Sequence, residues 1–334
     1  MLRVALLGAG RIGRVHATSI VMTKSCDLIA VADVNTDAAR DLAAEIGARA
    51  MSVEEIIADA SIDAVLIATS TDTHSDLIER ATSAGKAVLC EKPVDLSLER
   101  ALSTLAKAEA TGQPVMVGFN RRFDPNFAAL KTAFDKGEIG KGELLSITSF
   151  DPAPPPVSYV KVSGGLFRDM MIHDFDMACW IFGGTPAKVT ATGAALVDPE
   201  IGAAGDVDTA AVTMVWDDGR IAVIKNSRRA GYGYDQRIEV LGSDGLLSAA
   251  NVLENTVQKI TTEGAVSAKP VHFFLERYMR AYQDEWTAFV DAVQGGTTMP
   301  VTLREGVAAL ACAEAATRSM QTGQTVAITP DMLG

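Results

Sequence analysis

The sequence contains few cysteines and no long uncharged hydrophobic run. Its four cysteines (Cys26, Cys90, Cys179 and Cys312) are scattered, without a CxxC pair or a spacing typical of metal ligands. We therefore expect neither a disulfide framework nor a bound metal, and a zinc-dependent alcohol dehydrogenase is disfavoured. No run of 18 apolar residues is present, and the chain begins with strand-like MLRVALLGAG instead of a basic and then apolar leader. We expect a cytoplasmic protein without membrane spans.

Basic residues are also scarce relative to acidic ones. The 334 residues include 30 Lys and Arg against 42 Asp and Glu, which gives a formal net charge of −12. Such a chain is a poor partner for nucleic acid or anionic membranes, because both favour clustered Lys and Arg. Hydrophobic residues make up 48% of the chain, enough for a large core, and the length suggests about two domains.

The first 120 residues alternate between strand-like and helix-like segments. Strands are expected at 3–8, 26–33, 62–69, 86–93 and 114–119, with helices between them at 11–22, 36–47, 74–85 and 97–112. Continuous apolar runs such as RVALLG are typical of strands buried on both faces of a parallel sheet. The repeated units predict an α/β fold, with a doubly wound, Rossmann-type domain over residues 1–120.

The pattern changes after residue 120. We expect a helix at 124–140, a strand at 142–150, and an irregular loop in the proline- and glycine-rich stretch 151–165. An apolar helix then precedes strands at 187–197, 208–216, 219–229 and 235–243, with WDDGR as a hairpin turn, and long helices near 273–293 and 304–321. This order predicts a second, α+β domain over residues 121–334 with an open, largely antiparallel sheet. Its last helices can pack against the first domain.

The segment GAGRIG matches the GxGxxG pattern of dinucleotide-binding sites. It follows the first strand and opens the first helix, the context that the binding mechanism requires. Glycines permit the tight turn and let backbone N–H groups approach a pyrophosphate at the helix N-terminus. An ordinary glycine-rich turn is the alternative. We assign the whole turn to cofactor binding: Gly8, Ala9, Gly10, Arg11, Ile12 and Gly13.

Asp33 ends the second expected strand, 20 residues after Gly13. A carboxylate at this place accepts hydrogen bonds from the adenosine ribose hydroxyls and repels a 2′-phosphate. Neither Val34 nor Asn35, the next residues, supplies a compensating arginine. The sequence therefore predicts NAD, and not NADP, as the cofactor.

Two further segments should lie beyond the carboxyl ends of the strands, where open α/β sheets bind ligands. TSTDTH follows the third expected strand, so Ser70, Thr71 and His74 are candidates to line the cofactor channel. His74 is equally well explained as an exposed cap residue of the next helix. CEKP follows the fourth strand and brings Glu91 and Lys92 to the same edge.

The stretch FRDMMIHDFDMACW is apolar, yet it carries three aspartates and a histidine. On a continuous helix Asp169, His173 and Asp176 would lie within roughly 60° of arc. Apolar residues would cover nearly all the rest of the helix circumference, with Asp174 as the one interruption. Burying these groups without partners would cost several kcal/mol, so they must face one another or a polar pocket. An Asp–His hydrogen bond that only fixes packing is one interpretation. An imidazole oriented by a carboxylate for general-base work is the other.

Oxidation of an alcohol by NAD needs a base and a group that stabilises the developing alkoxide. His173 is a candidate for the base, with Asp169 orienting it. Lys92, at the edge of the sheet, is a candidate for the stabilising donor. Asp176 would accept hydrogen bonds from a polyol.

Several of these segments together resemble one family. GAGRIGRVHA, EKP, VGFNRRFDP and GGLFRDMMIHDFDMACW are similar to segments of the Gfo/Idh/MocA oxidoreductases, and most closely of their inositol 2-dehydrogenases. The resemblance covers essentially the whole chain, including SRRAGYGYDQRIEVLGSDG. It implies a Rossmann domain and a C-terminal α/β domain whose open sheet usually mediates tetramer formation. The implied reaction is NAD-dependent oxidation of a ring hydroxyl of a cyclic polyol to a ketone, with myo-inositol giving scyllo-inosose.

The resemblance also implies roles for individual residues. The family's catalytic lysine maps onto Lys92, and its aspartate and histidine four residues apart map onto Asp169 and His173. The aspartate that helps to bind the polyol maps onto Asp176. A tyrosine near the substrate is implied as well, and we prefer Tyr234 to its neighbour two residues earlier.

GFNRRF lies where the family's fifth strand meets the nicotinamide end. It implies Asn120 as a substrate-binding residue and Arg121 as a cofactor-binding residue. One departure is visible, because Phe150 stands where the family carries a basic residue before DP of the proline-rich loop. This departure leaves open scyllo- or chiro-inositol, an aldose or a sugar acid as the substrate. A non-catalytic NAD-sensing protein is a remoter alternative, which the joint presence of Lys92, Asp169 and His173 disfavours.

Overall fold

The computed structural model describes residues 1–334, which form two compact units. The first unit comprises Met1–Phe123, Arg280–Ala311 and Pro330–Gly334, and the second comprises Asp124–Met279 and Cys312–Thr329. Two long helices, α11 (Phe274–Gly295) and α12 (Leu303–Thr322), each contribute residues to both units. None of the helices combines the length and the apolar character that a membrane crossing requires.

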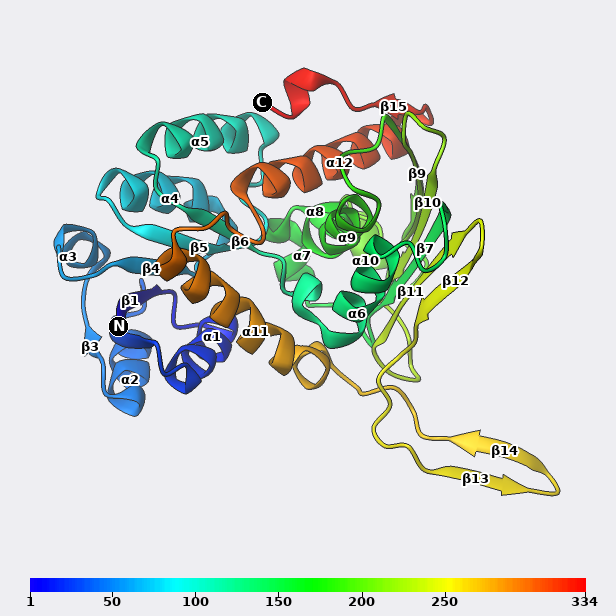
Figure 1. The fold of residues 1–334 in the computed structure, drawn as a ribbon, viewed down its shortest axis with the longest axis horizontal. Helices are drawn as coiled ribbons and strands as arrows, with labels where there is room; N and C mark the ends of the chain where they lie inside the picture. Colours follow the sequence, from blue (N-terminus) through cyan, green and yellow to red (C-terminus); the bar gives the residue numbers. More distant parts are fainter. The chain divides into compact units, whose positions relative to one another are not determined.

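A six-stranded parallel sheet in the order β3-β2-β1-β4-β5-β6 forms the centre of the first unit (Figure 1). Every residue of β4, β5 and β6 is buried, as their apolar sequences predict for all but Glu91, the last residue of β5. The strands are β1 (Leu2–Leu7), β2 (Cys26–Ala32), β3 (Arg49–Ala50), β4 (Ala64–Ile67), β5 (Ala87–Glu91) and β6 (Val115–Gly118).

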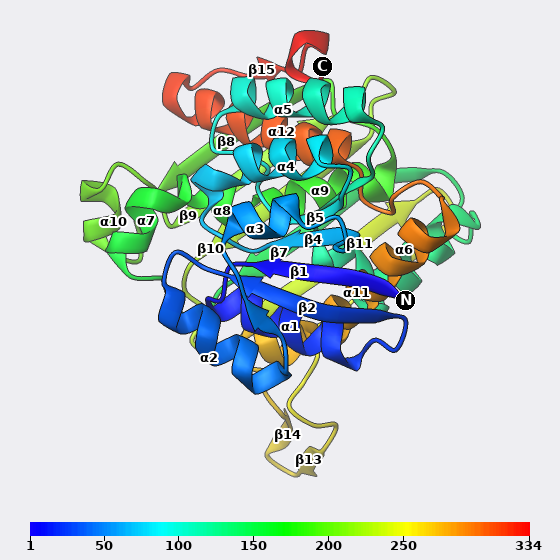
Figure 2. The same ribbon diagram turned by 90° about the vertical axis from the view of Figure 1, so that its left-hand side faces the viewer.

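Helices cover both faces of this sheet, with α1 and α2 on one side and α4 and α5 on the other (Figure 2). Capping residues set their ends: Asn35 and Ser97 accept hydrogen bonds from first-turn N–H groups, and Gly47 and Gly112 end α2 and α5 with positive φ. The helices are α1 (Arg11–Met22), α2 (Thr36–Ile46), α3 (Val53–Ala58), α4 (His74–Ser83) and α5 (Leu98–Thr111), with short 3-10 turns at Thr71–Thr73, Asn120–Phe123 and Pro330–Met332.

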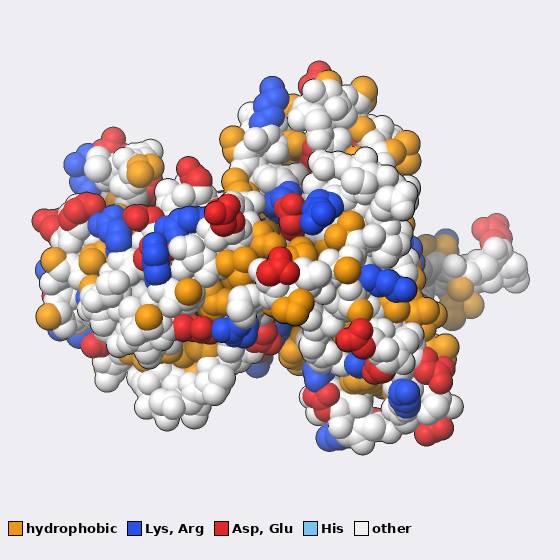
Figure 3. All heavy atoms as spheres, turned by 90° about the horizontal axis from the view of Figure 1, so that it is seen from above, with side chains coloured by type: hydrophobic (Ala, Val, Ile, Leu, Met, Phe, Trp, Pro, Cys, Tyr) orange, Lys and Arg blue, Asp and Glu red, His pale blue; other side chains and the backbone are white.

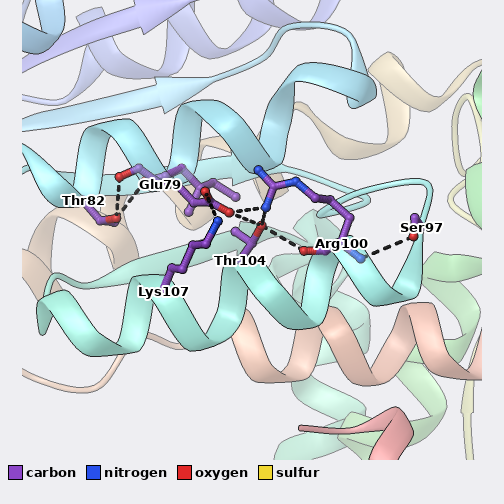
Figure 4. A network of polar contacts seen from close by, with 7 residues as sticks. Glu79, Thr82, Ser97, Arg100, Thr104 and Lys107 are labelled. Carbon is purple, nitrogen blue, oxygen red and sulfur yellow. Dashed lines mark hydrogen bonds and ion pairs between the residues drawn. The ribbon is translucent and has the colours of Figure 1, made fainter.

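α4 and α5 are joined by a polar network around Glu79 (Figure 4). The carboxylate accepts hydrogen bonds from Lys107 Nζ at 2.9 Å, from Thr104 Oγ1 at 3.0 Å, and from the guanidinium of Arg100. Burial alone would raise the pKa of Glu79, but these donors outweigh burial and lower the pKa to about 2. Glu79 therefore stays ionised at neutral pH and ties the two helices together.

The second unit contains a seven-stranded sheet in the order β12-β11-β7-β10-β9-β8-β15. All neighbouring strands are antiparallel except β10 and β7, which run parallel, so the largely antiparallel sheet is confirmed. Helices lie on only one face of the sheet (Figure 1). The strands are β7 (Gly142–Phe150), β8 (Lys188–Ala194), β9 (Thr209–Val215), β10 (Ile221–Ser227), β11 (Asp235–Gly242), β12 (Gly245–Ala249) and β15 (Val326–Ala327).

The helices of the second unit are mostly short. They are α6 (Pro125–Asp135), α7 (Val157–Ser163), α8 (Gly165–Asp169), α9 (Ile172–Phe182) and α10 (Pro199–Ala203). A separate hairpin of β13 (Gln258–Thr261) and β14 (Gly264–Ser267) projects away from the seven-stranded sheet (Figure 1). On the face shown in Figure 3, acidic and basic side chains are interspersed and form no continuous basic patch.

The expectation that 151–165 has no regular structure is wrong in part. Residues before Pro156 are irregular, but α7 begins directly after this proline, and Gly164 ends it with a φ of +86°. Proline is compatible with the start of a helix because the first N–H groups have no partner within the helix. The prolines thus mark where α7 begins and do not exclude it.

Candidate active site

Two of the three glycines of the GxGxxG turn are sterically required. A Cβ on Gly8, whose φ is +106°, would lie 2.4 Å from the carbonyl oxygen of Ala68, and one on Gly13 would lie 2.0 Å from that of Gly8. Gly10 has no neighbouring atom within 4 Å of that position, so the space in front of it is open.

The N-terminus of α1 has the properties of an anion site. Its cap residue, Gly10, has no side chain that could accept hydrogen bonds from the first-turn N–H groups. The first turn contains no acidic residue either. The first-turn N–H groups and the positive end of the helix dipole are therefore available to a pyrophosphate. This arrangement fits the expected dinucleotide.

Asp33 is fixed at the end of β2 by two backbone groups. Its Oδ2 accepts a hydrogen bond from the N–H of Ala9 at 2.6 Å, and its Oδ1 accepts one from the N–H of Asn35 at 2.7 Å. The side chain remains half-buried, so its oxygens can also accept from ribose hydroxyls. Asp33 thus links the glycine turn to the position that distinguishes NAD from NADP.

Replacement of Asp33 by serine is expected to reduce the preference for NAD over NADP. The change removes a carboxylate that repels a 2′-phosphate, so the ratio of kcat/KM for the two cofactors should fall by roughly ten-fold, or about 1.4 kcal/mol. Steady-state kinetics with NAD and with NADP measure this ratio. Asp37→Ser, at an exposed position in the first turn of α2, is the matched control. An unchanged ratio in Asp33→Ser would show that Asp33 does not select the cofactor.

His74 is not an exposed cap residue, contrary to one of the two expectations. The side chain is 1% exposed, with Nδ1 2.8 Å from the carbonyl oxygen of Pro93 and Nε2 3.2 Å from that of Thr69. Burial lowers its pKa, although both carbonyl contacts oppose this effect. His74 therefore connects the segment after β4 to the segment after β5. Its contact with a cofactor stays a prediction.

Glu91 is the last residue of β5 and its carboxylate is enclosed by polar groups. His16 Nε2 lies 2.7 Å from Oε1, and the N–H of Lys92 donates to Oε2 at 3.2 Å. Burial opposes ionisation, but the contacts with His16 and the positive charge of Lys92 outweigh it and lower the pKa of Glu91. An ionised Glu91 therefore holds the backbone of Lys92.

The first unit brings most of its predicted site residues to one edge. Because parallel strands end at the same side of the sheet, the segments after β1, β2, β4, β5 and β6 are neighbours there. Asn120 and Arg121, which follow β6, are 3% and 4% exposed. The residues at this edge are Gly8–Gly13, Asp33, Ser70, Thr71, Glu91, Lys92, Asn120 and Arg121.

In the second unit, the continuous helix predicted for 167–180 is interrupted. α8 ends at Asp169 and α9 begins at Ile172. The N–H groups of Met170 and Met171 both donate to the carbonyl of Leu166, so the regular bonding pattern shifts by one residue at this point. The predicted arc of Asp169, His173 and Asp176 assumed unbroken helical geometry and therefore does not describe their placement.

Asp169 is held by two residues that were not predicted from the sequence. Its Oδ1 accepts a hydrogen bond from the Tyr159 hydroxyl at 2.9 Å, and its Oδ2 accepts one from Arg228 at 3.1 Å. The Arg228 side chain is 2% exposed and that of Asp169 12%, so this ion pair is shielded from water. Tyr159 and Arg228 fix the carboxylate in place. Orientation of His173 by Asp169 stays a prediction.

The three aspartates of the stretch do not share one environment. Asp174, expected only as an interruption of the apolar face, is fully buried and accepts a hydrogen bond from Asn226 Nδ2 of β10 at 2.8 Å. Asp176 is 1% exposed and His173 is half-buried. Asp174 therefore has a partner in the sheet, a contact for a buried polar group that the sequence left unexplained.

The structure separates the two tyrosines near residue 233. Tyr232 is 49% exposed, and its hydroxyl donates to Asp235 at 2.5 Å; burial and this carboxylate raise its pKa to about 12. Tyr234 is 7% exposed and its ring packs edge-on against that of Tyr278. The Tyr232 hydroxyl is thus bonded to Asp235, and the choice of Tyr234 as a site residue stays a prediction.

The two units match two models of one protein family. Residues 2–119 match the description "Oxidoreductase family, NAD-binding Rossmann fold", and residues 131–328 match "Oxidoreductase family, C-terminal alpha/beta domain". The chain belongs to the Gfo/Idh/MocA oxidoreductase family. The resemblance seen in its motifs, the fold class and the NAD-binding domain are thereby confirmed.

Members of the Gfo/Idh/MocA family resemble the chain over its whole length. It is 48% identical over 327 residues to the inositol 2-dehydrogenase of Rhizobium meliloti (strain 1021), which covers 98% of this chain and 99% of that protein. The solved myo-inositol dehydrogenase from Corynebacterium glutamicum has a TM-score of 0.95 at 44% identity, with 99% of each chain covered. The scyllo-inositol dehydrogenase from Lactobacillus casei, solved with NAD(H) and scyllo-inositol, has a TM-score of 0.91 at 31% identity, with 98% and 99% covered.

Proposed function

We propose that the chain is an inositol 2-dehydrogenase that oxidises myo-inositol to scyllo-inosose with NAD. The full-length similarity to enzymes named as inositol dehydrogenases, one of them solved with NAD(H) and an inositol, is the observation that carries this proposal. The glycine turn and Asp33 supply the cofactor site that such a reaction needs.

In the proposed reaction, NAD supplies the hydride acceptor when it is bound. His173 removes the hydroxyl proton of the substrate, and Asp169 orients its imidazole. Lys92 donates to the oxygen on which negative charge develops, where a compact ammonium is an effective stabiliser. The ion pair of Arg228 with Asp169 supports these roles, because it fixes the carboxylate that acts on the base.

The remaining site residues divide between cofactor and substrate in the same proposal. Asp176, Asn120 and Tyr234 bind hydroxyl groups of the polyol, and their low exposure suits groups that recognise a substrate in a shielded site. The proposed cofactor residues are Gly8, Ala9, Gly10, Arg11, Ile12, Gly13, Asp33, Ser70, Thr71, His74, Glu91, Lys92 and Arg121.

We also assign domain roles and an assembly. Residues 1–120 bind NAD, and residues 121–334 bind the substrate and form the oligomer, a homotetramer in the cytoplasm. Exposed apolar residues of the seven-stranded sheet support this assignment, since Leu144, Ile221 and Leu241 are register partners on one face of β7, β10 and β11.

A panel of polyols tests the proposed substrate. We expect NADH formation with the highest kcat/KM for myo-inositol among myo-, scyllo- and chiro-inositol, an aldose and a sugar acid. Preference for scyllo- or chiro-inositol would keep the reaction and change the substrate. Phe150, half-buried at the end of β7 in place of the family's basic residue, is then the first position to vary. Faster oxidation of an aldose or sugar acid would contradict the proposal.

A further inference from the structure

Three ionisable side chains of the first unit, His16, Glu91 and Glu285, are buried. His16 of α1 is fully buried and its Nε2 lies 2.7 Å from Glu91 Oε1. Glu285 of α11 is also fully buried, and both of its carboxyl oxygens are without a hydrogen-bond partner. We call these three residues the carboxyl cluster. Nothing in the proposed reaction uses Glu285, yet burying a carboxyl group without a hydrogen-bond partner is costly.

The contacts of α11 direct Glu285 toward this cluster. Tyr282, one turn earlier, packs edge-on against the His16 ring with centroids 5.3 Å apart. Trp286, the next residue, donates from Nε1 to Cys26 Sγ at 3.3 Å. Both contacts face α1 and the start of β2, so Glu285 lies on the buried side of α11. The charge of Glu91 acts on it there.

The pKa values of the two carboxyl groups are shifted in opposite directions. Burial raises the pKa of Glu285 well above its ordinary value, and the negative charge of Glu91 adds to this effect. Glu91 has His16 and Lys92 as partners, and its pKa is lowered. The other charged or titratable group that acts on Glu91 is His74 of α4. Glu285 therefore holds a proton to higher pH than Glu91, in keeping with two buried carboxyl oxygens that have no hydrogen-bond partner.

The Glu91 carboxylate has little freedom to move. A Cβ on Gly118 of β6 would lie 3.3 Å from Glu91 Oε2, so the carboxylate packs directly against this glycine. The same oxygen accepts the N–H of Lys92. A change in the charge or position of Glu91 is therefore transmitted to the backbone of Lys92.

We propose that Glu285 is a positioning residue that, as a neutral acid, keeps the charge of the carboxyl cluster on Glu91 and thereby holds Lys92 in its catalytic position. The inference rests on the proposed function, in which Lys92 acts on the substrate. Ionisation of Glu285 would place two negative charges in one buried space and displace Glu91 from Lys92. Glu285 thus acts through Glu91 without touching substrate or cofactor.

The protonation of Glu285 is tested by stability, without any assay of activity. An acid whose pKa is raised in the folded state stabilises the fold below its unfolded pKa, and this stability is lost as the pH rises through the folded pKa. This one group lowers the folding constant by up to ten-fold per pH unit from about pH 4.3 up to its folded pKa. The free energy of unfolding of Glu285→Gln, measured with denaturant, should lack this pH dependence. Asp291→Asn, at an exposed position on the same helix, is the control and should keep it. Equal pH slopes in Glu285→Gln and wild type would overturn the proposal.

The positioning role is tested separately. Glu285→Gln and Glu285→Leu should both keep kcat near neutral pH at unchanged KM for NAD, and both should extend activity to higher pH, because neither side chain can ionise. A merely structural role would lower stability without changing the pH profile, and that result would also overturn the proposal. If the wild type oxidises no polyol, the pH dependence of Lys92 acetylation, followed by mass spectrometry, takes the place of kcat. A failure of the proposed function can then be distinguished from a failure of the proposed role of Glu285.

Discussion

Lys92→Ala is expected to lower kcat for polyol oxidation by about 10³-fold while NAD still binds. The variant loses the ammonium that stabilises the developing alkoxide, and removal of one such donor costs about 10²–10³ in rate. The glycine turn and Asp33 do not depend on this side chain, so NAD should still bind, with a dissociation constant raised only by the loss of the one contact that Lys92 itself makes. Steady-state NADH formation and calorimetric titration with NAD measure the two effects.

Two comparisons sharpen the Lys92 experiment. Lys24→Ala removes an exposed ammonium elsewhere in the first unit and should retain wild-type turnover. Lys92→Arg keeps the charge with a different geometry and should recover only part of the rate. Turnover of Lys92→Ala within ten-fold of the wild type would remove Lys92 from the reaction. A wild type that binds NAD and oxidises nothing would instead support a non-catalytic NAD-sensing protein.

His173→Gln is expected to lower kcat by about 10²- to 10⁴-fold, the range that general-base catalysis contributes. Glutamine has a similar size but cannot accept the hydroxyl proton. We expect the rate of the variant to rise with pH, because solvent hydroxide replaces the missing base. The pH dependence of kcat between neutral and alkaline solution measures this effect.

His272→Gln is the matched control, because His272 is an exposed histidine of the second unit. It should keep the wild-type rate and pH profile. If His173→Gln also kept them, His173 would not be the base. The alternative from the sequence, an Asp–His hydrogen bond that only fixes packing, would then be favoured, and the unfolding midpoint of the variant should be lower instead.

Elements whose ends are set by local chemistry were predicted well from the sequence. α1 and β7 have the predicted bounds, 11–22 and 142–150, and the glycine turn between β1 and α1 follows from spacing alone. β3, α3, α10 and the strands after β11 were missed because they are short. For α3 a signal was present, since Ser52 and Glu55 form a capping box that the sequence displays.

The environment of the site residues was less predictable. Arg228 and Asp169 are 59 residues apart in sequence, and His16 and Glu91 are 75 apart, so no local pattern relates the partners. The interruption between α8 and α9 has a similar cause: the apolar side chains of Met170 and Met171 are buried, and packing overrides the regular helix there. The sequence was sufficient to propose roles for the site residues. It did not identify the neighbours that fix those residues in place.

The β13–β14 hairpin lies outside the two large sheets of the fold. Residues 252–267 are exposed, and the strands of the hairpin pair only with each other. Two strands without a hydrophobic face add little to folding free energy. The stability of the single chain therefore depends little on this hairpin. An inserted peptide label would disturb the protein least at its tip.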